Sequence, residues 1–336
     1  MKRVYFQPGG REITSRDGET VLSAALRQGL VFPHSCRSGN CDTCRARLIS
    51  GKIAPGAAPG MQVDSQTRKS GSILLCQAVP LSDVVIEAHE LEAMAGMQVR
   101  MLSTRVLALE PLSRDVTALT LGLAKGRGNL EFCAGQYVDI LLWDHCRRSY
   151  SIASSPADSE VIELHVGRIR DGRFSEEELP VLKPGDLLPL MGPLGTFFLR
   201  DDPRPVIFVA EGTGFAPVAA MMEDLRRGGA RRSIRFYWGV GSREDLYRQD
   251  QIGRWVRDLG IEFSPVLLEP GPDWDGRRGR VHEVALAEHA DLSGMQVYAS
   301  GSSSMVAAVR ETFPDTGCVP MHCTASPSRM QWINPF

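Results

Sequence analysis

Four of the eight cysteines follow a pattern that suits an iron–sulfur cluster. Cys36, Cys41 and Cys44 form a C-x4-C-x2-C string, and Cys76 comes from a segment further along the chain. This is the spacing of plant-type [2Fe-2S] sites, in which two irons need two thiolates each. A four-cysteine zinc site is the alternative, but such sites usually show two C-x2-C-like pairs and this chain has one. We therefore predict that the four cysteines ligate a [2Fe-2S] cluster.

Arginines stand beside the cysteine loop. Residues 1–90 contain eleven Lys and Arg against eight Asp and Glu, so this segment is mildly basic, and Arg37, Arg45 and Arg47 flank the loop itself. A solvated face is the simpler interpretation of this balance. A docking rim for an acidic partner protein is the alternative hypothesis.

Four short strings further along the chain are typical of a known family. Their order is Ala134-Gly-Gln-Tyr137, Arg147-Arg-Ser-Tyr-Ser151, Gly172-Arg-Phe-Ser175 and Gly192-Pro-Leu-Gly-Thr196. An Arg-x-Tyr-Ser string alone says little, because an edge strand with an exposed arginine has the same residues. In this order, and ahead of a nucleotide-binding pattern, the strings resemble the ferredoxin–NADP reductase superfamily. The first 90 residues resemble the ferredoxin module of its oxygenase-type reductases.

The resemblance implies a bound flavin, and FAD in particular, because relatives with an N-terminal ferredoxin module generally use FAD. Arg148 would offer a forked cation to the flavin pyrophosphate, and the turn from Gly172 to Ser175 would add backbone N–H groups and a hydroxyl. Tyr150 would lie on the isoalloxazine face, with Ser151 near the reactive nitrogen. Further flavin-lining residues implied by the resemblance are His165, Val166, Phe174 and Thr213.

A glycine-rich turn predicts the nicotinamide site. Gly212, Thr213 and Gly214 stand between an expected strand and an expected helix, where phosphate can approach the backbone. A plain strand-to-helix turn would show the same residues, and the string is not G-x-G-x-x-G. Relatives usually carry glycine at the position of Glu211. An acid does not help to bind phosphate, so we expect this side chain to point away.

Ser300 and Gly301 form the second part of the predicted nicotinamide site. Relatives commonly carry a cysteine at the position of Ser300, beside the reacting carbon, and serine keeps its size but not its polarizable sulfur. Relatives also carry prolines where this chain has Ser302 and Ser303, so we expect a more flexible loop. The residues that we predict to act in hydride transfer are Ser151, Thr213 and Ser300.

Acidic residues favour NADH over NADPH. Glu244 and Asp245 follow an expected strand at the place where the adenosine ribose is read, and they would repel a 2′-phosphate. Arg243 beside them would instead attract that phosphate. Gly167 stands where plant-type relatives carry a lysine, which again favours NADH.

The elements that position these residues fall into three expected domains. Residues 1–90 are predicted to form a β-grasp ferredoxin domain, and residues 91–97 a linker. Short strands separated by Gly and Pro turns predict an antiparallel flavin-binding barrel over residues 98–201. Strand–helix alternation over residues 202–336 predicts a parallel nucleotide-binding sheet.

Local patterns predict individual elements. Thr20 is expected to cap a helix over 21–28 that Gly29 ends. The clearest expected strands cover residues 137–142, 161–166, 187–190, 206–210, 234–238 and 295–299. The tail from Cys318 to Phe336 matches no part of the family pattern.

Composition excludes several classes of protein. The net charge is −2, so nothing draws the chain towards nucleic acid or anionic membranes. No apolar run approaches the roughly 18 residues of a membrane span, and the N-terminal apolar stretch is too short for a secretory signal. We expect a cytoplasmic protein.

Over nearly its whole length the chain resembles ferredoxin–flavin–NADH reductases. The resemblance implies that electrons pass from NADH through FAD and the [2Fe-2S] cluster to an electron-accepting partner enzyme. That partner would be a deoxysugar dehydrase, as for reductases of the CDP-6-deoxy-3,4-glucoseen type, or a ring-hydroxylating oxygenase or monooxygenase. The alternatives are a non-catalytic interaction module that keeps the fold, and a self-contained oxidoreductase, for which no substrate-activating base stands out.

Overall fold

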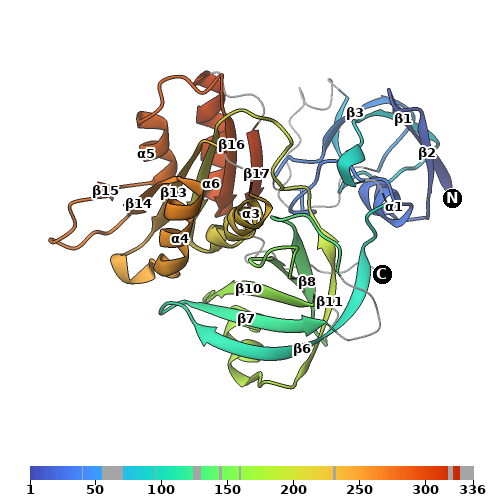
Figure 1. Ribbon diagram of the computed structural model, residues 1–336. Helices are drawn as coiled ribbons and strands as arrows, with labels where there is room; N and C mark the ends of the chain where they lie inside the picture. The colour runs from blue at the N-terminus through green and yellow to red at the C-terminus, as the bar shows by residue number, and fades with distance from the viewer. Residues whose placement is uncertain are drawn as a thin grey trace. The chain divides into compact units, whose positions relative to one another are not determined.

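The computed structural model describes residues 1–39, 41–54, 71–94, 96–123, 130–143, 146–158, 160–229, 232–316 and 321–325 (Figure 1). The chain forms two compact units. The first comprises Met1–Arg100 with Leu194–Thr196, and the second comprises Met101–Pro193 with Phe197–Phe336. Of the tail from Cys318 to Phe336, only residues 321–325 are described. None of the described helices is long and apolar enough to cross a membrane.

The first unit is built on a mixed five-stranded sheet. Its strands are β1 (Lys2–Gln7), β2 (Arg11–Ser15), β3 (Arg45–Ser50), β4 (Ser72–Leu74) and β5 (Val84–Glu87), in the order β2-β1-β5-β3-β4. β1 and β5 run parallel, and the other neighbours run antiparallel. Val4, Phe6 and Ile86 are buried in one core with helix α1 (Val21–Arg27). The predicted β-grasp fold is confirmed.

The expected signals at the ends of α1 are present. The Oγ1 of Thr20 accepts a hydrogen bond from the N–H of Ser23 at 3.2 Å, and Gly29 adopts a φ of +78°. The helix is one residue shorter than predicted, because Gln28 already leaves helical geometry as the C-cap. A short 3-10 turn, η1 (Glu92–Met94), lies in the predicted linker.

His34 holds the segment Leu194–Thr196 within the first unit. Its Nε2 accepts a hydrogen bond from the N–H of Gly195 at 3.1 Å, and its own N–H donates to Thr196 Oγ1 at 2.9 Å. The other ring nitrogen, Nδ1, lies 2.8 Å from the carbonyl oxygen of Phe32, to which it donates. Burial lowers the pKa of His34 to about 4, so the ring is neutral at physiological pH and keeps this tautomer.

The second unit contains an antiparallel barrel. Its strands are β6 (Arg100–Pro111), β7 (Val116–Leu123), β8 (Tyr137–Leu141), β9 (Arg147–Ser151), β10 (Val161–Gly167) and β11 (Leu187–Leu194), in the order β10-β7-β6-β11-β8-β9. A β-bridge between Ile152 and Leu164 connects the two edges of this sheet and closes it on itself. The short helices η2 (Arg173–Glu178) and η3 (Leu179–Val181) connect β10 to β11.

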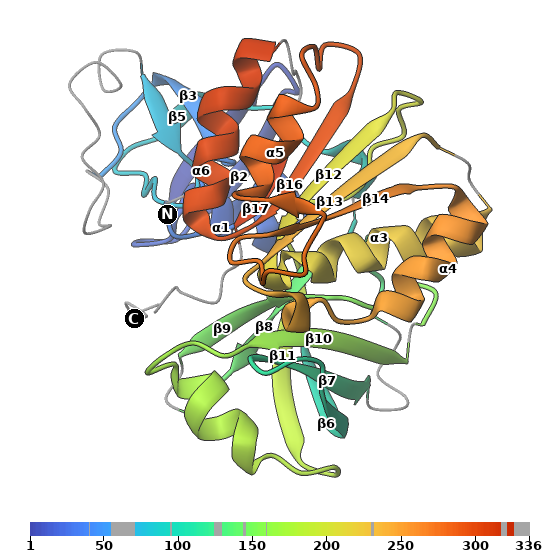
Figure 2. The ribbon, with the colours of Figure 1, turned by 90° about the vertical axis from the view of Figure 1, so that its left-hand side faces the viewer.

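The remainder of the second unit is a parallel sheet with helices on both faces (Figure 2). The strands are β12 (Val206–Glu211), β13 (Ile234–Val240), β14 (Glu262–Leu267), β15 (Arg277–Arg278), β16 (Gln296–Gly301) and β17 (Met321–Ala325), in the order β15-β14-β13-β12-β16-β17. The helical elements are η4 (Gly212–Gly214), α3 (Phe215–Gly228), η5 (Arg243–Asp245), α4 (Gln249–Leu259), α5 (Val281–Ala287), α6 (Ser303–Thr312) and η6 (Phe313–Thr316). Phe208 of β12 faces the core with α3 and α4, whereas Ile207 and Val209 face the core with α5 and α6. Burial on both faces explains the continuous apolar sequence of β12.

The predicted fold class is confirmed in all three parts of the chain. The expected strands at 206–210 and 234–238 begin where β12 and β13 begin, and each observed strand runs further. β11 also extends beyond the expected 187–190, to Leu194. The predicted domain boundaries stay predictions.

Candidate functional site

The four predicted cluster cysteines lie together in the first unit, and all are buried, with 4 to 6% of each exposed. Cys44 directly precedes β3, and Cys76 follows β4. Because β3 and β4 pair antiparallel with Arg45 opposite Leu74, these two cysteines are brought to the same end of the sheet. The N–H of Leu75 donates to the carbonyl oxygen of Cys44 at 3.0 Å and fixes this approach.

The four thiols form two pairs. Cys36 is hydrogen-bonded to Cys41, and Cys44 is hydrogen-bonded to Cys76. Within the pairs, the neighbouring thiol and burial raise the pKa of Cys41 and of Cys44, whereas the hydrogen bond from Cys44 lowers the pKa of Cys76. Two pairs side by side offer two thiolates to each of two irons.

The backbone of the cysteine loop turns its N–H groups towards sulfur. Arg37 and Asp42 adopt left-handed φ values of 58°, which non-glycine residues rarely do, and Gly39 has a φ of 86°. The N–H of Ser38 lies 3.3 Å from the Sγ of Cys36, and the N–H of Cys36 itself lies 3.3 Å from the Sγ of Cys41. Such donors stabilise thiolate ligands and tune a cluster's potential.

The arrangement fits a two-iron cluster better than a single zinc ion. A zinc ion would need all four thiolates around one point. The paired thiols and the N–H groups aimed at them are the features that a [2Fe-2S] cluster uses.

The hypothesis of a basic docking rim loses much of its support. Arg45 forms an ion pair with Asp42 and donates to Ser72 Oγ at 2.8 Å. Arg47 forms an ion pair with Glu87 at 2.5 Å. Because both guanidinium charges are locally compensated, the solvated-face interpretation is the better one for these two arginines.

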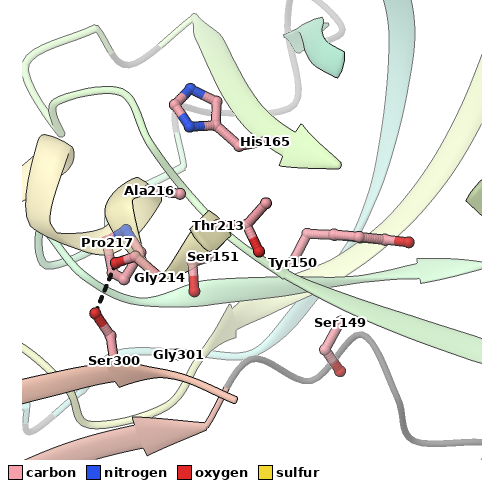
Figure 3. A pocket seen from close by; sticks show the side chains of 10 residues that line it. All are labelled: Ser149, Tyr150, Ser151, His165, Thr213, Gly214, Ala216, Pro217, Ser300 and Gly301. Atoms are coloured by element: carbon pink, nitrogen blue, oxygen red, sulfur yellow. Dashed lines mark hydrogen bonds between the residues drawn. The ribbon is translucent and has the colours of Figure 1, made fainter. Parts of the chain in front are cut away.

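A pocket in the second unit brings the flavin and nicotinamide motifs together (Figure 3). Its wall includes seven of the predicted site residues, namely Tyr150, Ser151, His165, Thr213, Gly214, Ser300 and Gly301, together with Ser149, Ala216 and Pro217. β9 and β10 of the barrel supply the first three, the turn η4 after β12 carries Thr213 and Gly214, and the end of β16 carries Ser300 and Gly301. The predicted residues outside this wall are Arg148, Val166, Gly172, Phe174, Ser175 and Gly212.

Arg148 is buried without an acidic partner. Its side chain, on β9, is 9% exposed and donates through Nη1 to the carbonyl oxygen of Arg147 at 2.9 Å. Among the described residues it forms no ion pair with a carboxylate. A buried guanidinium requires a compensating anion. The flavin pyrophosphate is such an anion, and the forked donors of arginine match it.

The predicted phosphate turn is tightly packed around Ser175. The Oγ of Ser175 accepts from the N–H of Ile169 at 3.1 Å, and a Cβ added to Gly172 would lie 2.6 Å from that Oγ. Phe174 is buried and packs against the ring of Tyr150, with the ring centroids 5.6 Å apart. Phe174 therefore supports Tyr150 rather than lining the pocket. Val166 is likewise part of the barrel core.

His165 presents its ring to the pocket while both ring nitrogens are engaged elsewhere. Nε2 lies 2.9 Å from Glu163 Oε1, and Nδ1 lies 3.3 Å from the hydroxyl of Tyr247. Burial raises the pKa of Glu163, but hydrogen bonds from His165 and Arg248 outweigh it and hold that pKa below its usual value. Phe215 stacks on the His165 ring at 5.9 Å. The sequence motifs gave no sign of these partners.

The glycine-rich turn is joined by hydrogen bonds to β16, through Ser300, and to β13, through Trp238. Ser300 Oγ donates to the carbonyl oxygen of Gly214 at 2.6 Å, and the indole N–H of Trp238 donates to the carbonyl oxygen of Gly212 at 3.0 Å. A Cβ on Gly214 would lie 2.1 Å from the carbonyl oxygen of Ser300, so only glycine fits there. The hydroxyl proton of Ser300 is thus committed to the hydrogen bond with Gly214. The lone pairs of the Ser300 oxygen can still accept a hydrogen bond from a ligand.

The side chain of Glu211 points away from the glycine-rich turn, as predicted. Its Oε2 accepts hydrogen bonds from the hydroxyl of Ser302 at 2.5 Å and from the N–H of Ser302 at 3.3 Å. The hydroxyl oxygen of Ser302 also accepts from the N–H of Met305 at 3.2 Å and caps α6. These hydrogen bonds restrain Ser302 in the absence of a proline ring, and the expectation of a more flexible loop stays a prediction.

Three family descriptions match the chain in series. A 2Fe-2S iron-sulfur cluster binding domain covers residues 4–81, an oxidoreductase FAD-binding domain covers 103–199, and an oxidoreductase NAD-binding domain covers 208–311.

Relatives resemble the chain over nearly its full length. The CDP-6-deoxy-L-threo-D-glycero-4-hexulose-3-dehydrase reductase of Yersinia pestis is 34% identical over 315 residues, which is 94% of each chain. The reductase component 1 of terephthalate 1,2-dioxygenase from Comamonas sp. is 34% identical across 89% of each chain. The crystal structure of the Amycolatopsis cytochrome P450 reductase GcoB superposes with a TM-score of 0.83 at 31% identity, covering 97% of this chain and 99% of that one.

Proposed function

The chain belongs to the family of reductase components that join a [2Fe-2S] domain, an FAD-binding domain and an NAD-binding domain, and from this we propose that it passes electrons from NADH to a separate enzyme. The observation that carries the proposal is the pocket in which Tyr150 and Ser151 of the barrel meet Thr213 and Ser300 of the parallel sheet. FAD, when bound, accepts two electrons at once from a nicotinamide and releases them singly, as an iron–sulfur acceptor requires.

The chain's own residues bind and orient the reactants. Arg148 would compensate the charge of the flavin pyrophosphate, and the turn from Gly172 to Ser175 would offer it further hydrogen-bond donors. Ser151 and Thr213 present hydroxyls along the pocket wall. Ser300 and Gly301 of the same wall, together with the glycine-rich turn, would hold the nicotinamide against the flavin. Cys36, Cys41, Cys44 and Cys76 hold the cluster that accepts the electrons.

The proposal takes NADH as the donor rather than NADPH. The Oδ2 of Asp245 accepts from the N–H of Ser242 at 2.9 Å and from its hydroxyl at 3.1 Å. The N–H and hydroxyl of Ser242, which could otherwise donate to a 2′-phosphate, are therefore already bonded to Asp245. The carboxylate of Asp245 would also repel that phosphate. The pKa of Glu244 is lowered by hydrogen bonds from the backbone N–H of Glu244 itself and from the side chain of Ser242. The side chain of Glu244 is therefore also anionic. The exposed Arg243, by contrast, favours the phosphate.

The proposed partner is a deoxysugar dehydrase in the cytoplasm. A dehydrase reductase matches 94% of the chain, which supports this choice. Reductase components of oxygenases match at the same identity over 89%, so an aromatic-ring oxygenase is the second candidate. Purified acceptors of both kinds, mixed with the chain and NADH, test the choice through the rate at which each acceptor is reduced.

The absorption spectrum tests the electron path. Reconstituted protein should show flavin and iron–sulfur bands that NADH bleaches. A spectrum with both cofactors but no bleaching would support a non-catalytic interaction module. Cys41→Ser should abolish reduction of one-electron acceptors and leave flavin reduction by NADH intact, whereas Cys133→Ser, which alters a half-buried cysteine outside the cluster, should change neither. Loss of both activities in Cys41→Ser would contradict the proposed division of labour.

A further inference from the structure

Glu211 is the last residue of β12 and brings a carboxylate to the carboxyl end of the parallel sheet. Residues 210 and 300 pair in register between β12 and β16, so Glu211 and Gly301 stand side by side at the carboxyl ends of two parallel strands. A Cβ added to Gly301 would lie 2.7 Å from the Cβ of Glu211. Because Gly301 lines the pocket, the stem of Glu211 packs directly behind the pocket wall.

The carboxylate is held in place but its charge is not cancelled by a cation. Both hydrogen bonds from Ser302 reach the same oxygen, Oε2, at the N-terminus of the ten-residue helix α6. A helix N-terminus stabilises a carboxylate in its charged form. Among the described residues, no lysine or arginine forms an ion pair with Glu211.

The histidine within electrostatic reach of Glu211 does not compensate it either. His282 lies on α5, is 8% exposed, and its Nδ1 has no hydrogen-bond partner among the described residues. Burial lowers the pKa of His282, although Glu211 acts in the opposite direction. The imidazole is therefore neutral at physiological pH and does not offset the negative charge of Glu211 behind the pocket wall.

A fixed negative charge at this place distinguishes the two redox forms of a nicotinamide dinucleotide. The reduced ring is neutral and the oxidised ring is a cation, whereas the pyrophosphate charge is the same in both. We propose that Glu211 selects the oxidised form, so that the pocket binds NAD⁺ more tightly relative to NADH than it would with an uncharged residue there. This inference rests on the proposed function, because it takes the ring to lie along the wall formed by Ser300 and Gly301.

The proposed selection has a consequence for the reaction. Tighter binding of the oxidised ring shifts the equilibrium of hydride transfer on the protein towards product by the same factor. The reduced flavin is then more fully populated, and release of NAD⁺ becomes slower. Glu211 acts here through charge, without touching the reacting atoms.

The test compares two ligands that differ mainly in the charge of the ring. NAD⁺ and the redox-inert 1,4,5,6-tetrahydro-NAD, whose ring is uncharged, are titrated into the oxidised protein with both cofactors bound. Glu211→Gln should weaken NAD⁺ about threefold to tenfold and leave the uncharged analogue nearly unchanged. Glu283→Gln, which removes an exposed carboxylate from α5, should alter neither affinity. If Glu211→Gln does not hold FAD, Glu211→Ala serves instead.

Ser302→Ala separates charge from loop structure. It removes the hydrogen bond from the hydroxyl but keeps the carboxylate, so the preference for NAD⁺ should persist. Equal weakening of both ligands in Glu211→Gln, no change in either, or loss of the preference in Ser302→Ala would each overturn the inference. The proposed function is judged separately, since NADH should still bleach the flavin in all these variants.

Discussion

The hydroxyl of Ser300 donates a 2.6 Å hydrogen bond to the carbonyl oxygen of Gly214 (Figure 3). This bond joins the end of β16 to the glycine-rich turn after β12, and both residues line the same pocket. Ser300 is buried, with 1% of its surface exposed. Serine here therefore positions one wall of the pocket against the other, which a cysteine would do more weakly because a thiol is a poorer donor.

Ser300→Ala should destabilise the second unit and slow hydride transfer. The variant removes the hydroxyl that donates to the carbonyl oxygen of Gly214, which costs about 0.5 to 1.5 kcal/mol of unfolding free energy. Urea titration measures that cost, and stopped-flow bleaching of the flavin by NADH measures the rate. Ser300→Cys should fold normally, and its rate of flavin reduction by NADH should lie between those of the unaltered protein and Ser300→Ala. Unchanged stability in Ser300→Ala would show that the bond does not position the wall.

Arg148→Ala should lose FAD. Removing a buried guanidinium that compensates a pyrophosphate should weaken FAD binding by about 2 to 3 kcal/mol, or roughly a hundredfold. Arg148→Lys keeps the charge but lacks the forked geometry, so its affinity for FAD should lie between those of the unaltered protein and Arg148→Ala. Fluorescence of released FAD gives the dissociation constants. Arg147→Ala, at the neighbouring half-buried position, is the matched control, and an equal loss of FAD there would remove the special role of Arg148.

Chemistry that depends on spacing along the chain was predictable from the sequence. The four cluster cysteines and the turn around Gly212 and Gly214 are short motifs, and their geometry follows from local backbone conformation. The pocket accordingly contains seven of the predicted site residues. The fold class was predictable for a related reason, since strand and helix periods differ and change along the chain.

Contacts between distant segments were not predictable from motifs. The bond between Tyr247 and His165 joins residues 82 positions apart, and the bond between Ser302 and Glu211 joins residues 91 positions apart. Serine in place of proline at positions 302 and 303 suggested a more flexible loop, because a motif comparison considers each position separately. The structure instead pairs two departures from the family pattern, Glu211 and Ser302, so that each supplies a partner for the other.

The lowered pKa of Glu163 leads us to predict that the stability of the folded protein depends on pH. Its pKa is lowered in the folded protein, so the stability that it contributes is present above its unfolded pKa of about 4.3 and is lost as the pH falls through the folded value. The unaltered protein should therefore exceed Glu163→Gln in stability at pH 7, and the difference should shrink below about pH 4. Urea unfolding of both proteins, followed by flavin fluorescence, measures this difference. A gap that stays constant down to acidic pH would contradict the ion-paired state of Glu163.

Gly214→Ala should abolish nucleotide binding, whereas Gly228→Ala should be harmless. A Cβ at Gly214 would lie 2.1 Å from the backbone oxygen of Ser300, so the turn and β16 must separate and the pocket wall opens. At Gly228, the last residue of α3, an added Cβ meets nothing within 4 Å and alanine favours the helix, so stability should stay the same or rise by up to about 1 kcal/mol. Titration of NAD⁺ and thermal unfolding compare the two variants. Normal NAD⁺ affinity in Gly214→Ala would mean that the close approach of Gly214 and Ser300 is not needed to form the site.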